Sequence, residues 1–203
     1  MPGSGHRTDK DRFLAVLKIN IFLFIFEIIV GYTSGSLSMT SDGFHASLHI
    51  FASLVALISE YQFIGLPPEK IKLLSAGINI ALFFPLAFMI AYEANKRWQS
   101  PPIINLTSTF FFVAILGLLA NIYATIILKP EHRETYSKNK NKFYLFIHMV
   151  FDTIGSVIVL TGAIQISRTN TYSIDSVSSF ILAGLIVLAA IWLSLGLMSK
   201  HEH

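Results

Sequence analysis

The sequence contains no cysteine, and this absence excludes disulfide bonds and thiolate metal sites. Charged residues are also scarce, at 13% of the 203 residues, whereas 53% are hydrophobic and the mean hydropathy is +0.62. A soluble domain usually carries about 25% charged residues. We therefore expect a membrane protein, and the net charge of +3 gives no reason to expect a nucleic-acid partner.

The sequence is rich in long apolar segments. A transmembrane helix needs about 20 largely apolar residues to cross the hydrocarbon layer. Six such segments lie near residues 13–33, 37–59, 71–94, 105–128, 142–167 and 177–198. Membrane strands would be alternating segments of about 10 residues, so the pattern predicts an all-α membrane protein with a six-helix bundle.

We expect one transmembrane domain over residues 13–198, followed by a short tail over 199–203. Residues 1–12 are interpreted as an N-terminal segment that opens on an expression remnant, "MPGSGH".

Basic residues are divided unevenly between the two sides of the predicted helices. Of the 15 Lys and Arg residues, only Lys96, Arg97 and Arg168 fall on one side, and the other twelve fall on the side of the two termini. Short cytoplasmic loops carry the excess of Lys and Arg. Both termini are thus predicted to be cytoplasmic, in a multi-pass protein of a bacterial inner membrane.

Ionisable residues interrupt two of the predicted spans. His45 and His49 lie in 37–59, and His148 and Asp152 lie in 142–167. Each pair is spaced i, i+4, which places both side chains on one helix face. Such groups are expensive in hydrocarbon and usually face the interior of a bundle. With a rise of about 1.5 Å per residue, both pairs are predicted at similar depth near the membrane midplane.

Three imidazoles and one carboxylate suit a tetrahedral metal ion such as Zn²⁺. The same donors also accept Cd²⁺, Co²⁺, Fe²⁺, Mn²⁺ or Ni²⁺, so donor type does not fix the metal. We expect this ion to be transported cargo, with no resident cofactor and no enzymatic activity. Metal binding requires the deprotonated imidazole, so protons would compete with the metal and could drive an exchange.

Other polar residues in the spans are candidates for an outer shell or a pathway. A site with one carboxylate would carry +1 when it holds a divalent ion, and we expect either that Glu27 or Asp42 offsets this charge or that the site stays hydrated. Helix-to-helix hydrogen bonding is the default interpretation for the remaining candidates. The full set is Asp42, Glu27, Asn20, Asn121 and Ser156.

Two other interpretations of the histidines are compatible with the sequence. They could bind haem through two axial imidazoles, which a Soret band would reveal. They could also belong to a metal sensor or scaffold, which would bind the ion without flux in proteoliposomes. A membrane di-iron oxidase would need many more histidines than the seven present.

Four sequence stretches resemble the cation diffusion facilitator family over about residues 13–198. They are "FEIIVGYTSGSLSMTSDGFH", "AYEANKRWQSPP", "GLLANIYATIIL" and "HMVFDTIGS". The resemblance implies that His45, His49, His148 and Asp152 form the transport site. It also implies proton-coupled Zn²⁺ export by alternating access, and a homodimer.

The sequence departs from the family pattern at three points. His49 stands where the zinc-selective site of the family has Asp, so the resemblance does not identify the metal. Members of the family usually have a cytoplasmic C-terminal domain after the sixth span, and we expect this sequence to be a short form without it. The fourth loop, "KPEHRETYSKNKNK", lacks the His-rich stretch of many eukaryotic members.

Overall fold

The apolar segments form helices, and clusters of Gly, Pro, Ser and Asn separate them. The computed structural model describes residues 9–61, 67–129 and 140–198. The helices are α1 (Asp9–Ser34), α2 (Leu37–Tyr61), α3 (Pro68–Gln99), α4 (Ser108–Leu128), α5 (Lys140–Thr169) and α6 (Ser173–Met198). All regular secondary structure in the described ranges is helical, which confirms the predicted all-α class.

Several predicted boundaries differ from those of the structure. Helix α1 begins at Asp9 and so includes part of the predicted segment 1–12, and α3 extends beyond the predicted 71–94 on both sides. Hydropathy marks only the part of a helix that lies in hydrocarbon, whereas the helical backbone continues into polar flanks. The predicted tail 199–203, and most of the fourth loop, lie outside the described residues.

The bundle exposes large apolar side chains and buries a set of polar ones, as expected for a protein in a membrane. By length and hydropathy, the described parts of α1, α4, α5 and α6 can each cross a bilayer. Large apolar side chains such as Tyr32, Phe88 and Phe112 are exposed, whereas Asn20, Glu27 and other polar residues are buried. The chain is an integral membrane protein. The side chains of α2 and α3 are described only in part, and the count of six spans stays a prediction.

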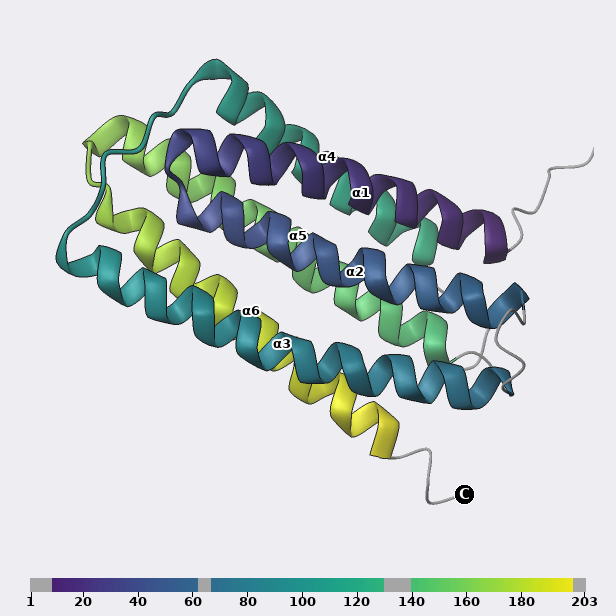
Figure 1. Ribbon diagram of the computed structural model, residues 1–203. Helices are drawn as coiled ribbons and strands as arrows, with labels where there is room; N and C mark the ends of the chain where they lie inside the picture. Colours follow the sequence, from purple (N-terminus) through teal and green to yellow (C-terminus); the bar gives the residue numbers. More distant parts are fainter. Residues whose placement is uncertain (1–8, 62–66, 130–139, 199–203) are drawn as a thin grey trace, which may run out of the picture.

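Consecutive helices run in opposite directions (Figure 1). Tight turns make this possible: Gly35 between α1 and α2 has φ +79°, and Asn170 between α5 and α6 has φ 53°. Glycine adopts this left-handed conformation without steric cost, and asparagine tolerates it. The start of α1 and the end of α6 consequently lie at the same end of the bundle.

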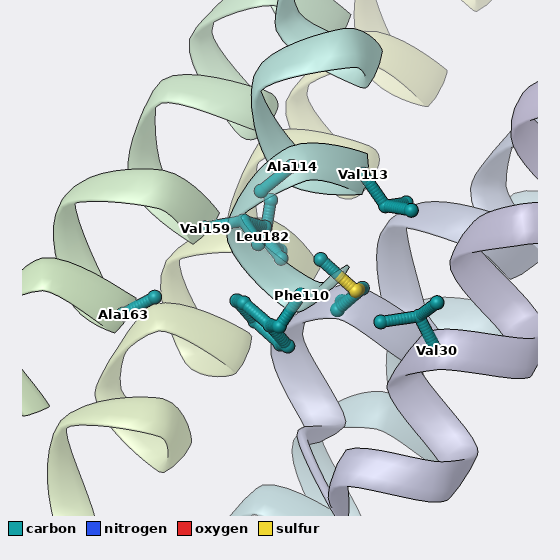
Figure 2. Packing of buried hydrophobic residues seen from close by; sticks show 8 residues of the cluster. Val30, Phe110, Val113, Ala114, Val159, Ala163 and Leu182 are labelled. Carbon is teal, nitrogen blue, oxygen red and sulfur yellow. The ribbon is translucent and has the colours of Figure 1, made fainter. Parts of the chain in front are cut away.

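A cluster of buried apolar residues joins five helices near the α1–α2 turn. Figure 2 shows Phe110 of α4 at its centre, with Val30 of α1 on one side and Ala163 of α5 on the other. The complete cluster comprises Val30, Met39, Phe110, Val113, Ala114, Val159, Ala163 and Leu182. Lipid tails are as apolar as these side chains, so close packing is what holds the helices together here.

Helices α3 and α6 pack against each other through small residues. Their shared cluster contains Ala87, Ala183 and Ala190, together with Phe83, Ile90 and Ile186. Small side chains let two membrane helices approach closely. Helix α3 continues through Pro85 to Gln99, although proline cannot donate the usual helical hydrogen bond.

Asp175 in the first turn of α6 caps a different helix. Its Oδ1 accepts from Ser36 Oγ at 2.7 Å and from Ser38 Oγ at 2.6 Å, and its Oδ2 accepts from Leu37 N at 2.7 Å. A carboxylate at a helix N-terminus satisfies free N–H groups and interacts favourably with the helix dipole. Asp175 therefore fixes α6 to the start of α2.

Helices α1 and α2 touch at a glycine. A Cβ added at Gly31 would lie 2.6 Å from the backbone N of Thr40 and 2.9 Å from its Cα. Real Cβ atoms do not approach a backbone so closely, so only glycine permits this helix spacing.

We expect Gly31→Ala to lower the stability of the folded protein by about 1–3 kcal/mol, the usual cost of forcing extra volume into a packed site. Thermal unfolding in detergent measures the effect. Gly184→Ala is the matched control, because a Cβ at Gly184 meets no atom within 4 Å. Equal midpoints for the two variants would contradict the close approach of α1 and α2.

Candidate metal site

Two antiparallel helices bring four buried side chains together. His45 and His49 lie one turn apart on α2, and His148 and Asp152 lie one turn apart on α5. One potential ligand atom from each of the four lies within 4.8 Å of the others. All four side chains are buried. The geometry therefore places these predicted site residues around one point.

Asp152 lies between the two histidines of α2. Its Oδ1 is hydrogen-bonded to His45 Nε2 at 2.9 Å. Its Oδ2 lies 3.2 Å from His49 Nε2, but neither of these two atoms has a hydrogen-bond partner, so the contact lacks the geometry of a hydrogen bond. One carboxylate thus faces both imidazoles of the other helix.

The three imidazole rings pack against one another. Ring centroids are 4.7 Å apart for His45 and His49, 4.5 Å for His49 and His148, and 5.5 Å for His45 and His148. Three cationic imidazolium rings this close would repel strongly in a low dielectric. The arrangement therefore suits neutral rings whose lone pairs can bind a cation.

Several polar atoms of the site have no partner within the protein. They are His45 Nδ1, His49 Nε2, His148 Nδ1 and Asp152 Oδ2. Buried polar atoms in native proteins are almost always hydrogen-bonded or bound to an ion. Unpartnered imidazole nitrogen and carboxylate oxygen are donors that a first-row divalent ion accepts. The donor set therefore fits a metal ion.

A chain of hydrogen bonds adjoins the four residues. Asn121 Nδ2 of α4 donates to Ser156 Oγ of α5 at 2.8 Å, and Ser156 Oγ donates to Asp42 Oδ2 of α2 at 3.2 Å. Three of the predicted outer residues therefore lie in one network. Asp42 is not a member of the four-residue group, although it precedes His45 by one turn.

Glu27 and Asn20 are buried on α1 and do not belong to the four-residue group of the candidate metal site. Glu27 is 3% exposed, and a Cβ at Gly117 of α4 would collide with its Oε1. The Glu27 carboxylate therefore occupies space that is free because residue 117 is glycine. Asn20 is also buried, and its Nδ2 has no hydrogen-bond partner.

The buried interior is acidic. Glu27, Asp42 and Asp152 are buried, and no Lys or Arg is buried among the residues whose side chains the structure describes. A cavity of about 20 Å³, room for roughly one water molecule, adjoins this region. Its lining includes Asp42, His45 and Asp152, together with Leu182 and Ile186 of α6.

Two features near the site were not predicted from the sequence. The ring of Phe83 on α3 contacts two of the histidines. Thr125 of α4 donates to the carbonyl of Met149 at 3.0 Å and lies 3.1 Å from Thr153 Oγ1. The sequence gives a weak indication of the threonine contact, since Thr125 follows Asn121 by one turn and so lies on the same helix face. No sequence pattern distinguishes Phe83, because phenylalanine is common in apolar spans.

Residues 13–195 match the model of the cation efflux transmembrane domain, which is nearly the whole described chain. The chain belongs to this family, which confirms the resemblance to the cation diffusion facilitators.

Among individual proteins, the chain is similar to the metal cation efflux system protein CzcD of Cupriavidus metallidurans, with 32% identity over 96% of this chain and 60% of that protein. It is also similar to the zinc transporter ZitB of Yersinia pestis, with 29% identity over 91% of this chain and 60% of that protein. A third relative is the probable zinc transporter MSC2 of Saccharomyces cerevisiae, with 26% identity over 90% of this chain. The chain spans about 60% of the length of the two bacterial relatives.

Proposed function

We propose that this protein transports a divalent transition-metal cation across the membrane, and that His45, His49, His148 and Asp152 hold the cation in transit. The observation that carries the proposal is the set of four buried ligand atoms within 4.8 Å of one another, contributed by two helices. Membrane transporters commonly place their substrate between helices near the midplane. Membership in the cation efflux family supports the same function.

Zinc is the first candidate for the cargo. Zn²⁺ accepts three imidazoles and one carboxylate in a tetrahedral shell, and relatives named as zinc transporters are similar over most of this chain. Cd²⁺, Co²⁺, Fe²⁺, Mn²⁺ and Ni²⁺ share part of this ligand chemistry. Competition between these ions in a flux assay would rank them.

The charge of the loaded site involves the neighbouring carboxylates. Asp152 and three neutral imidazoles carry −1, so a bound divalent ion leaves +1. Such a charge is costly in a low dielectric unless an anion lies nearby. We assign this role to Asp42, which Ser156 holds by a hydrogen bond, and to the buried Glu27.

The direction and coupling of transport are further parts of the proposal. The protein exports its cation from the cytoplasm in exchange for protons by alternating access, with both termini cytoplasmic, as a homodimer in a bacterial inner membrane. The imidazoles must be deprotonated to bind the metal, so protons and metal compete for one site. The uneven distribution of Lys and Arg supports the orientation.

Proteoliposomes loaded with a zinc-sensitive dye test this function. We expect wild-type protein to move Zn²⁺, and His148→Ala and His49→Ala to fall to about one tenth of that rate or lower, since even residues that only orient a metal ligand contribute 10–100-fold. A pH-sensitive dye in parallel vesicles should report proton movement opposite to the metal.

Ser47→Ala on α2 is the matched control, because Ser47 Oγ bonds to the carbonyl of Phe44 in its own helix. It should retain the wild-type rate. Wild-type flux by His148→Ala would defeat the assigned site, and flux of metal without proton movement would defeat the exchange.

A further inference from the structure

Phe83 contacts the candidate site from a third helix. It lies on α3 and is 2% exposed. Its ring stacks on His45 with centroids 5.6 Å apart and planes at 26°, and its centroid lies 5.5 Å from that of His148 with planes at 53°. These are the distances of favourable ring contacts. One aromatic ring therefore packs against an imidazole from α2 and another from α5.

Hydrogen bonds leave part of the orientation of these two imidazoles unfixed. A metal-binding histidine nearly always donates its other ring N–H to a carboxylate, a carbonyl or water, which fixes the plane of the ring. His45 is hydrogen-bonded through Nε2 to Asp152 Oδ1 at 2.9 Å, whereas its Nδ1 and His148 Nδ1 are buried and have no partner in the protein. One hydrogen bond still lets an imidazole turn about that bond, so packing against the Phe83 ring is a further contact that holds both ring planes.

Phe83 is itself held by the packing of α3 against α6. It belongs to the cluster of Ala87, Ile90, Ala183 and Ala190, which leaves little freedom for the ring. Pro85 lies two residues beyond it and cannot donate to the carbonyl one turn earlier, so the backbone near Phe83 lacks one helical hydrogen bond. The packing of α3 against α6 therefore holds the ring against the two imidazoles of α2 and α5.

We propose that Phe83 is a positioning residue that determines metal specificity. Its ring fixes the planes of His45 and His148 and occupies the α3 side of the site, where additional water ligands would otherwise bind. Four donors without room for more favour ions that accept tetrahedral coordination, such as Zn²⁺ and Co²⁺. Ions that prefer six oxygen-rich ligands, such as Mn²⁺, are disfavoured. This inference rests on the proposed function of the four residues.

Cobalt spectroscopy of the purified full chain in detergent tests the proposal. Tetrahedral Co²⁺ absorbs visible light much more strongly than octahedral Co²⁺. We expect an intense visible band for wild-type protein titrated with CoCl₂, and a weaker, shifted band for Phe83→Leu. The ratio of Zn²⁺ to Mn²⁺ affinity, measured by competition, should fall about 10-fold in this variant, the lower range for loss of a residue that orients a metal ligand.

Two further variants keep the test decisive. Phe83→Met removes the ring with a flexible side chain that fills gaps, and it replaces Phe83→Leu if that variant does not fold. Phe84→Leu changes the adjacent phenylalanine, which is 46% exposed, and should leave the spectrum and the affinity ratio unchanged.

The outcomes separate this inference from the function on which it rests. A wild-type spectrum and a wild-type affinity ratio in a folded Phe83→Leu or Phe83→Met variant would overturn the role of Phe83. Absence of any Co²⁺ band in wild-type protein, or an unchanged band in His148→Ala, would instead overturn the metal site.

Discussion

Asp152→Ala is expected to weaken metal binding by about 100-fold or more, which is about 2.8 kcal/mol at 1.4 kcal/mol per tenfold change. Asp152 is the only carboxylate of the four, and its two oxygens face His45 and His49 at 2.9 and 3.2 Å. Its loss removes both a ligand and the negative charge that offsets half of a divalent cation. Calorimetric titration with Zn²⁺ in detergent measures the change.

Glu93→Gln provides the control for loss of a carboxylate. Glu93 is on α3, where it pairs with Arg97 at 3.0 Å outside the site, and its loss should leave the affinity for Zn²⁺ unchanged. If Asp152→Ala bound Zn²⁺ as tightly as wild-type protein, the carboxylate would not be a ligand.

Asp175→Ala is expected to destabilise the fold by roughly 3 kcal/mol or more, because hydrogen bonds to a charged group contribute about 1.5–3 kcal/mol each. The carboxylate accepts from Ser36 Oγ, Ser38 Oγ and the backbone N of Leu37, and Ser38 N lies 3.2 Å from Oδ1. Its removal takes this acceptor from the buried backbone N–H groups of Leu37 and Ser38, while Ser36 Oγ and Ser38 Oγ, 3.2 Å apart, can still bond to each other. Thermal unfolding in detergent should show the loss as a lower midpoint.

A double-mutant cycle distinguishes this cap from a general effect of mutation. Ser38→Ala removes one donor, so its cost should be smaller in the Asp175→Ala background than in wild-type protein. Ser176→Ala changes a buried neighbour on α6 and should cost less than Asp175→Ala. Strictly additive costs for Ser38 and Asp175 would contradict the hydrogen bond between them.

The four candidate ligands could be predicted because ionisable residues are rare in apolar spans. The i, i+4 spacing of each pair indicates a shared helix face. Because consecutive helices alternate in direction, the second and fifth spans run in opposite directions, and counting residues from each end then places both pairs at one depth. These arguments need only the local sequence and the thickness of a membrane, which is why the grouping of His45, His49, His148 and Asp152 follows from them.

The contacts made by Phe83 and Asp175 could not be predicted in this way. An apolar residue in an apolar span has the same local pattern whether it faces lipid or a histidine. Asp175 stands in the first turn of α6, where local rules favour a cap of its own helix. It instead caps α2, which is distant in sequence. Both contacts depend on how α3 and α6 pack against the other helices, and helix packing is not encoded in local periodicity.

The acidic interior has a consequence for the ions that can enter the protein. Glu27, Asp42 and Asp152 are buried, and no basic side chain is buried with them in the part of the chain that the structure describes. Each of these carboxylates that is ionised raises the energy of any anion that approaches through the low dielectric. Chloride and phosphate would be repelled from the route that a metal ion would follow, and a transported ion would leave its counter-anions in bulk water before it reached the histidines.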